Sequence, residues 1–429
     1  MTMTRSEMSL REDANALRDD LVALRRALHQ EPEIGLHLPR TQEKVLAALD
    51  GLPLEISTGT ALSSVTAVLR GGRPGPAVLL RGDMDALPVT ERTGVEFSSR
   101  VEGAMHACGH DLHTAGLVGA ARLLAARRAD LPGDVVFMFQ PGEEGWDGAG
   151  HMIEEGVLEA AGRTVSAAYG LHVSSSGFPT GTFVCRPGPF MAASAGLYVR
   201  VIGAGGHGSR PHNALDPVPA ACEMVTALQT MITRRFDVFD PVVITVGRLQ
   251  AGTRRNIIPD EAVFDATVRT FSESAAEQVG AYATRLCTDI ADAYGLSVEV
   301  RYEPEYPVTV NHDSGHQLVA ETVREVFGEH RFHELANPFT GSEDFSRVLD
   351  RVPGAYAFLG ATMSADPATA PANHSALAAF DDNVLPDAAT LLAELAVREL
   401  RQAEAAAEST VESTDRSTAD GAEIAGVHA

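Results

Sequence analysis

Val135-Val-Phe-Met-Phe139 runs directly into Gln140-Pro-Gly-Glu-Glu-Gly145, and this stretch decides the fold. Five apolar residues with β-branched and aromatic side chains, closed by a Pro-Gly turn, predict a buried strand. Similar runs occur at 65–69, 77–80 and 167–171, and helical patterns accompany them at 17–28, 114–128 and 149–161. Strands that alternate with helices predict an α/β fold with a mostly parallel sheet and helices on both faces.

The segment from 190 to 303 has a different order of elements. It reads as strand 195–201, helix 217–233, strands 242–249 and 262–270, helix 274–294 and strand 297–302. This is the order of a ferredoxin-like α+β unit. We therefore expect an inserted domain at 190–303, between the two parts of a catalytic domain at 15–189 and 304–402. After a last helix at 386–401, the acidic stretch 403–429 has few large apolar residues and is expected to be a disordered tail.

The overall charge excludes some classes of partner. A formal net charge of -24 would repel phosphate backbones and anionic lipid, so neither nucleic acid nor a membrane surface is expected as a partner. No apolar run approaches the roughly 20 residues that span a bilayer, and the first residues lack a signal-peptide core. The four widely spaced cysteines show no disulfide pattern. We expect a cytoplasmic protein.

Three histidines, a cysteine and an aspartate crowd into the eight residues His106-Ala-Cys-Gly-His-Asp-Leu-His113 at the predicted start of a helix. Gly109 allows a tight turn, so Cys108 and His110 could face one cation. Thiolate and imidazole donors suit zinc and related transition metals. The alternative interpretation is a polar helix start without a metal, and a zinc finger is disfavoured because a second cysteine pair is missing.

Two adjacent carboxylates, Glu143 and Glu144, follow the strand at 135–139. Ligands of open parallel sheets bind beyond the carboxyl ends of strands, and consecutive residues of an extended chain point to opposite sides. Glu144 is the expected metal ligand, and Glu143 the general base that takes a proton from water and passes it to the leaving nitrogen. A solvated turn is the alternative.

Further candidates stand at the ends of other predicted strands. His172 directly follows the run 167–171, and His374 lies in a loop beyond a predicted strand at 355–359. A lone histidine is more often structural, but convergence on one sheet edge favours ligands. Asp83 ends the run after 77–80 and could orient a metal-bound histidine from outside the coordination sphere, although a plain turn is the alternative.

These motifs together resemble the aminoacylase and carboxypeptidase family of dimetal metallopeptidases, in its amidohydrolase branch of auxin-conjugate and hippurate hydrolases. The resemblance covers about residues 17–400. It rests on Arg81-Gly-Asp-Met-Asp-Ala-Leu-Pro88, Met105-His-Ala-Cys-Gly-His-Asp111, Gln140-Pro-Gly-Glu-Glu-Gly145, Leu171-His172, Gly205-Gly-His-Gly-Ser-Arg-Pro-His212, Asn256-Ile-Ile-Pro259 and Gly341-Ser-Glu-Asp-Phe345, in the family's order.

The resemblance implies two divalent metal ions, zinc first, with manganese, cobalt or nickel as alternatives. Cys108 would bridge the ions, His110 and His172 would bind one, and Glu144 and His374 the other, with Glu143 as base. The resemblance also implies a homodimer, in which the inserted domain acts as a lid and supplies groups to the partner's active site.

Three residues of the inserted domain match family positions. His207 would stabilise the oxyanion, and Asn256 and Arg269 would hold the carbonyl and carboxylate of the substrate. The chain departs from the family at Trp146-Asp147, where small residues are usual, at Leu112, where glycine is usual, and at Ala376, where proline is usual.

We therefore expect a metal-dependent amidohydrolase that cleaves N-acyl amino acids. A carbamoyl-amino-acid or peptide hydrolase would share the same metals, and only the acyl pocket would separate them. A metal-dependent sensor on a degenerate scaffold would have lost at least one of the six groups Cys108, His110, Glu143, Glu144, His172 and His374, but all six are present.

Overall fold

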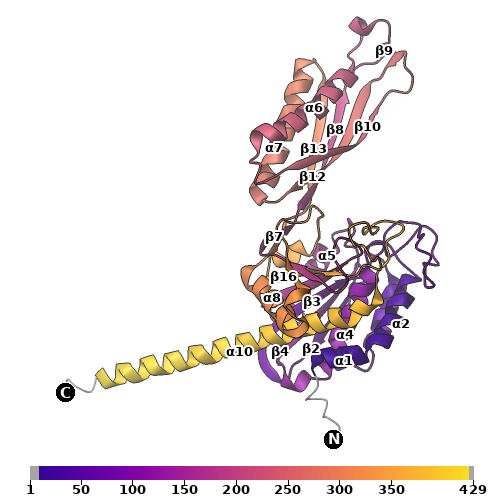
Figure 1. Ribbon diagram of the computed structural model, residues 1–429. Helices are drawn as coiled ribbons and strands as arrows, with labels where there is room; N and C mark the ends of the chain where they lie inside the picture. The colour runs from indigo at the N-terminus through magenta and orange to yellow at the C-terminus, as the bar shows by residue number, and fades with distance from the viewer. Residues whose placement is uncertain (1–8, 425–429) are drawn as a thin grey trace. The chain divides into compact units, whose positions relative to one another are not determined.

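The computed structural model describes residues 9–424, with side chains as far as residue 409. Within these residues the chain forms two compact units (Figure 1). The first unit comprises the described residues up to Pro187, Asn311–Leu335 and the described residues from Val348 onward. The second unit comprises Gly188–Val310 and Ala336–Arg347.

The first unit is built on one eight-stranded sheet. Its strands are β1 (Leu54–Thr58), β2 (Val65–Leu69), β3 (Arg73–Asp83), β4 (Pro132–Gln140), β5 (Ala167–Ser174), β6 (Phe183–Cys185), β15 (Phe332–Glu334) and β16 (Gly354–Gly360). Their order is β1-β2-β4-β3-β5-β16-β6-β15, and the four central strands β4, β3, β5 and β16 are parallel. Every residue of β4 is buried, as expected for a strand covered on both faces. The predicted mostly parallel α/β fold is confirmed.

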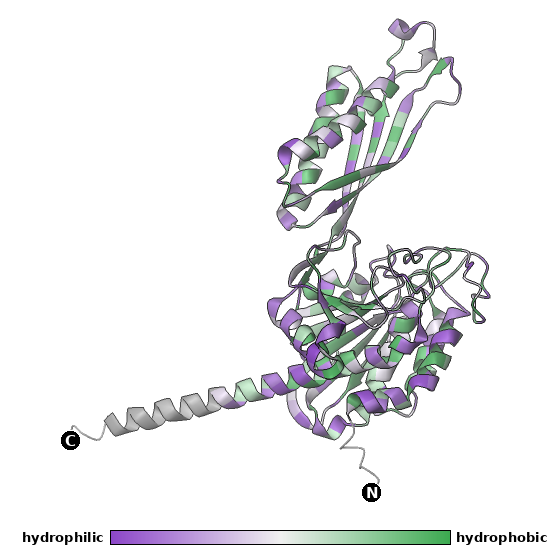
Figure 2. Cartoon of the chain, viewed as in Figure 1, coloured by the Kyte–Doolittle hydropathy of each residue, from purple (hydrophilic) through white to green (hydrophobic). Residues whose placement is uncertain are grey.

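Helices flank this sheet and turn their apolar sides toward it (Figure 2). They are α1 (Leu10–Ala16), α2 (Arg18–His29), α3 (Pro39–Leu49), α4 (His110–Ala125), α5 (Gly148–Glu154), α8 (Asp313–Phe327) and α10 (Leu385–Ile424), with the short α9 (Ser346–Leu349) at the unit boundary and 3-10 turns at Arg128–Asp130, Val157–Glu159, Glu329–Arg331 and Asp382–Val384. Both α4 and α10 pack against β3 and β5, while α5 contacts β4.

The stretch 403–424, which was expected to be disordered, is part of the last helix. α10 continues from Leu385 to Ile424, so 403–424 is helical, and 425–429 lie outside the described residues. Ala and Glu, which dominate the beginning of this stretch, have high helix propensity and extend a helix that is already nucleated. Despite this length, none of the helices in the described part of the chain is apolar enough to cross a bilayer.

The second unit is a four-stranded antiparallel sheet covered by two helices. Its elements are β7 (Gly188–Met191), β8 (Ala193–Ile202), β9 (Gly206–His207), a 3-10 turn (Pro211–Asn213), α6 (Pro217–Arg235), β10 (Val243–Ala251), β11 (Ile257–Ile258), β12 (Glu261–Thr270), α7 (Glu273–Ala293), β13 (Ser297–Tyr306) and β14 (Thr309–Asn311). The sheet order β10-β12-β8-β13 is that of the ferredoxin-like fold predicted from the element order. Side chains of α6 and α7 and of one sheet face form its core.

The second unit also includes a segment that the sequence pattern assigned to the catalytic domain. Residues 336–347 belong to it because Phe339 pairs with Met191 in a β-bridge and packs its ring 5.5 Å from that of Phe190. These contacts join residues about 150 positions apart, and local periodicity carries no signal for them.

The four parallel strands end at one edge of the first sheet. Asp83 at the end of β3 is paired with Gln140 at the end of β4, and Ser174 of β5 with Gly360 of β16. The loops that follow therefore meet at the carboxyl edge, where open α/β sheets bind ligands.

Candidate active site

The turn before α4 places Cys108 and His110 at this edge. Gly109 adopts the left-handed conformation, with φ of 83°, and a Cβ there would lie 2.4 Å from Val173 Cγ2. Only glycine fits such a turn without strain. Helix α4 consequently begins at His110, four residues before the helical pattern in the sequence, and Cys108 and His110 are both buried.

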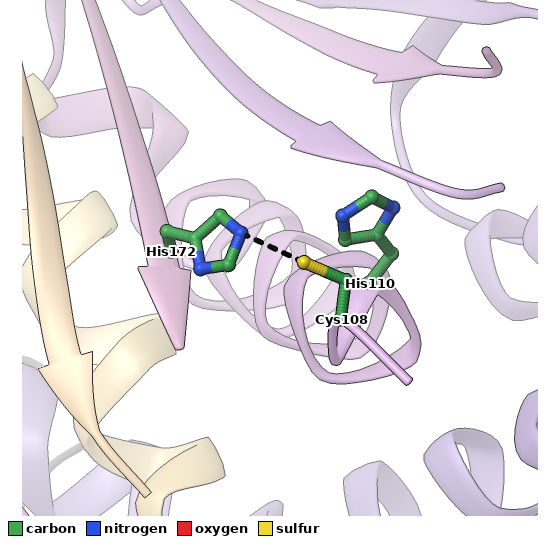
Figure 3. A group of neighbouring side chains, drawn as sticks. All are labelled: Cys108, His110 and His172. Atoms are coloured by element: carbon green, nitrogen blue, oxygen red, sulfur yellow. Dashed lines mark hydrogen bonds between the residues drawn. The ribbon is translucent and has the colours of Figure 1, made fainter. Parts of the chain in front are cut away.

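His172 faces Cys108 from inside strand β5 and does not follow the strand as predicted, because β5 continues to Ser174. Its Nε2 lies 3.3 Å from Cys108 Sγ (Figure 3), and its ring stacks on Phe358 with centroids 4.7 Å apart. The Nδ1–H donates to the Val173 carbonyl oxygen at 2.7 Å, which leaves the lone pair on Nε2. Burial, together with the charge of neighbouring histidines, holds the pKa of His172 well below its usual value. A neutral imidazole of this kind can ligate a metal.

A carboxylate from the neighbouring loop fixes Glu143 and Glu144. Asp85 Oδ1 accepts the N–H of Glu143 at 3.0 Å, and Oδ2 accepts the N–H of Glu144 at 3.1 Å. The Oδ1 atom also lies 3.4 Å from His110 Nδ1. Asp85 was quoted in the sequence motif without a role. Its contacts, which join it to residues 58 and 59 positions later, leave no local pattern from which a role could be derived.

His374 approaches the cluster from the loop after β16. Its φ of 71° is one of two positive values at non-glycine residues in the described chain, and its N–H donates to the Ala107 carbonyl oxygen at 2.9 Å. Its Nε2 lies 3.1 Å from Glu144 Oε1. Hydrogen bonding to Cys108 and then to Glu144 raises the pKa of His374 to about 10.

The neighbouring Asn373 holds this loop in place. Its side-chain amide donates to the carbonyl oxygens of Cys108 at 3.2 Å and Val173 at 3.0 Å, and its oxygen accepts the N–H of Ser175 at 2.9 Å. Sequence reasoning gave Asn373 no role, and a single asparagine in a loop offers no signal for one.

Two groups of possible metal donors share one sulfur. Cys108, His110 and His172 bring donor atoms within 4.8 Å of one another, and so do Cys108, Glu144 and His374. Among the described residues, both ring nitrogens of His110 are buried without a hydrogen-bond partner. Buried polar atoms are rarely left unpaired, so this imidazole fits a metal ligand. Thiolate, imidazole and carboxylate suit zinc and related ions.

Asp83 is engaged mainly by residues other than His110. Its Oδ1 accepts from His113 Nδ1 at 2.5 Å and its Oδ2 from Arg81 at 2.6 Å, while His110 Nε2 is 3.6 Å away. Burial alone would raise the pKa of Asp83, but Arg81, His110 and His113 hold it well below its usual range. His113 also accepts the Val173 N–H at Nε2, so both of its ring nitrogens are occupied. Asp83 and His113 therefore support the possible metal ligands without being among the five that were predicted.

The remaining predicted residues lie in the second unit. His207 in β9 is exposed and pairs with Ile257 of β11, next to Asn256, whose carbonyl oxygen accepts the Gly208 N–H at 2.9 Å. Arg269 lies near the Thr270 end of β12 and donates a hydrogen bond to Thr267 Oγ1 at 2.7 Å. The structure thus brings His207 and Asn256 together and leaves Arg269 apart.

Two groups of possible metal donors that share the Cys108 sulfur, with a carboxylate oxygen of Glu143 within 4.8 Å of donor atoms of His110 and Glu144, form a candidate two-metal site. Residues 79–398 match the family described as Peptidase family M20/M25/M40, and the chain belongs to this family. It is a metal-dependent amidohydrolase that holds two divalent metal ions.

Several relatives align along nearly the whole chain. Thermostable carboxypeptidase 2 of Saccharolobus solfataricus is 37% identical, with 91% of this chain and 98% of the relative covered. N-acetylcysteine deacetylase of Bacillus subtilis is 36% identical, over 88% and 96%. IAA-amino acid hydrolase ILR1-like 4 of Arabidopsis thaliana is 35% identical, over 90% and 87%. The solved structure of the Bacillus subtilis YXEP protein, described as a dinuclear metal-binding peptidase of the M20 family, has a TM-score of 0.77 at 33% identity, over 90% and 99%.

Proposed function

We propose that the enzyme hydrolyses N-acyl amino acids to a carboxylic acid and a free amino acid. The observation that carries the proposal is the pair of donor groups meeting at Cys108, beside which Glu143 brings a carboxylate oxygen within 4.8 Å of donor atoms of His110 and Glu144. The named deacetylase and IAA-amino acid hydrolase relatives support an acyl amino acid as substrate.

Cys108, His110, His172, Glu144 and His374 would hold the two ions, with zinc as the first candidate and manganese, cobalt and nickel as alternatives. Bound ions of this kind lower the pKa of water and polarise a carbonyl. Glu143 then accepts the proton of the attacking water and delivers it to the leaving amine nitrogen. Asp85 fixes the backbone of Glu143, which limits the positions open to its carboxylate.

His207, Asn256 and Arg269 are proposed to bind the substrate, with His207 donating to the developing oxyanion and Arg269 pairing with the carboxylate. Glu261 and Arg269 are eight residues apart in β12, or about 27 Å at 3.4 Å per residue. Strand β9 lies beyond the Glu261 end (Figure 1). Since one small substrate cannot reach both ends, this supports a homodimer in which different chains supply His207 and Arg269.

The dimer can be tested by mixing two inactive variants, Glu143→Gln and His207→Ala. If the chains share their sites, hybrid dimers contain one site with both residues intact, and activity returns on mixing. Mixing that restores nothing, although hybrid dimers form, would show that each chain works alone.

A screen of N-acetyl, N-benzoyl and N-carbamoyl amino acids and of dipeptides, each with zinc, manganese, cobalt or nickel, tests the substrate. Turnover of an N-acyl amino acid is expected. Cleavage of dipeptides alone would support the second candidate, a carboxyl-terminal peptidase, which the carboxypeptidase relative favours. We propose a cytoplasmic location, which the four free cysteines support.

A further inference from the structure

Most of the large exposed apolar side chains described in the first unit lie in the loops that follow its parallel strands. The large ones among its described residues are Ile34, Ile56, Trp146, Met363 and Leu377. All but Ile56 belong to the carboxyl edge of the sheet. Trp146 lies in the loop after β4, and Met363 and Leu377 lie in the loop after β16. Ile34 is bridged to Ala86 in the loop after β3. The apolar rim, as we call these four residues, therefore shares its loops with the metal donors.

Trp146 is the largest member of the apolar rim, and its indole lies close to Gly35. It lies two residues after Glu144 and is 52% exposed. A Cβ added at Gly35 would lie 3.2 Å from the indole Cε2, and one at Gly142 would lie 3.1 Å from the Trp146 Cβ. One side of the Trp146 indole thus lies against the backbone of Gly35, and about half of the side chain is left exposed to a ligand.

The half-exposed Trp146 ring, two residues after Glu144 in the same loop, is a candidate contact for a ligand. Exposed apolar surface is unfavourable, and where it gathers at a site it marks ligand binding. Ligand pockets are lined mainly by apolar and aromatic side chains, with a few polar groups that fix orientation.

The chemistry of the substrate identifies the occupant. The acyl group is bonded to the amide carbonyl carbon at about 1.5 Å, so a carbonyl positioned for attack beside Glu143 places the acyl group among the same loops. The other end of the substrate is an amino acid whose negative carboxylate is proposed to pair with Arg269 of the second unit and is costly to bury against apolar side chains. Of the two ends, only the acyl group suits the rim.

We propose that Trp146, with Ile34, Met363 and Leu377, binds the acyl group and makes the enzyme select bulky apolar acyl groups, aromatic ones in particular, over acetyl. An aroyl ring would stack on the open part of the indole in an offset or edge-to-face arrangement. The inference rests on the proposed hydrolysis of N-acyl amino acids and adds to it which acyl class is taken.

The kinetic test compares N-benzoyl and N-acetyl derivatives of one amino acid. The wild-type enzyme should prefer benzoyl, and Trp146→Ala should lower kcat/KM for benzoyl by roughly tenfold while leaving acetyl nearly unchanged. Trp146→Phe should retain most of the preference because it keeps a ring. Ile56→Ala, which removes an exposed apolar side chain on β1, is the matched control and should alter neither substrate.

Binding can be followed without turnover, because Trp146 is the only tryptophan of the chain. In the metal-loaded Glu143→Gln variant, the N-benzoyl amino acid should change the tryptophan fluorescence saturably. The N-acetyl analogue should require at least about tenfold more ligand. Equal responses to both ligands, or no response to either, would overturn the inference.

The two proposals fail in different ways. If the wild type cleaves both substrates equally well and Trp146→Ala affects both alike, the acyl-binding role of the rim is refuted while amide hydrolysis stands. If fluorescence separates the two ligands but neither is cleaved with any of the four metals, the proposed reaction is refuted and the apolar-ligand site remains.

Discussion

Asp85 accepts a hydrogen bond from the backbone N–H of Glu143 at 3.0 Å, so the residue proposed as general base is held by its main chain. The second oxygen of Asp85 takes the N–H of Glu144 at 3.1 Å. Two adjacent amides bound by one carboxylate leave the Glu143-Glu144 turn little freedom. Asp85 also lies 3.4 Å from His110 Nδ1, so this one side chain contacts the proposed base and two proposed metal ligands.

Asp85→Asn should therefore impair the chemical step. An amide side chain has a single acceptor oxygen and would leave one of the two N–H groups unpaired. We expect kcat to fall by about ten- to a hundredfold, the range found for groups that orient metal ligands, with little change in KM. Steady-state kinetics with metal analysis of the same samples would measure this, and Asp19→Asn on an exposed part of α2 is the control. A loss confined to KM would contradict the positioning role.

Glu143→Gln should abolish most turnover and leave the metals bound. The amide cannot accept a proton, and loss of a general base typically costs a factor of about a hundred to ten thousand. Metal content measured by mass spectrometry should stay at the wild-type level, since Glu143 is not among the five proposed ligands. Retained activity would rule out Glu143 as the base.

Much of the fold could be predicted because short patterns determine its elements. The run at 65–69 matches β2 residue for residue, and the run at 135–139 lies inside β4. The start of α4 was placed too late because the left-handed Gly109 lets the helix begin among polar residues. Residues 336–347 belong to the second unit because they contact β7. A local sequence pattern cannot predict a contact between segments so far apart in the chain.

The candidate site was predictable where one motif holds several groups. Cys108, His110, Glu143 and Glu144 come from two tight motifs. His374 depended on the family resemblance, since its position follows from a left-handed backbone and from the bonds of Asn373 to two distant segments. Asp85 was missed for the same reason, because its partners lie in another loop.

Removing the metals should destabilise the protein. Cys108 stands in both groups of possible donors, so ions bound there would tie α4, β5 and the two loops of Glu144 and His374 together. Each ion present at about a hundred times its dissociation constant would contribute about 3 kcal/mol to the free energy of unfolding. Chelation should lower the thermal midpoint, and Cys108→Ser should reduce the difference between metal-loaded and chelated protein.

Cys222→Ser, which changes an exposed thiol on α6, is the matched control for that experiment and should keep the wild-type difference. If chelation left the midpoint of the wild type unchanged, the donor groups would not hold ions that matter for folding.

The stability in acid should depend on Glu91. Its side chain is 4% exposed, and burial would raise its pKa, but hydrogen bonds from His29, the Ser99 N–H and Thr93 lower the pKa from 4.5 to about 2. Because the pKa is lower in the folded state, the stabilisation is complete above about pH 4.5 and is lost as the pH falls toward 2. Its size is on the order of 2 kcal/mol.

Glu91→Gln should therefore be less stable than the wild type at pH 7, and the gap should close between about pH 4.5 and 2. Urea unfolding at a series of pH values would measure it, with Glu96→Gln at an exposed position as the control. Over this range His29 stays protonated, since Asp111 and Glu91 raise its pKa above 6.5 against the effect of burial. The change can then be assigned to Glu91, and a gap that stayed constant down to pH 2 would contradict the assignment.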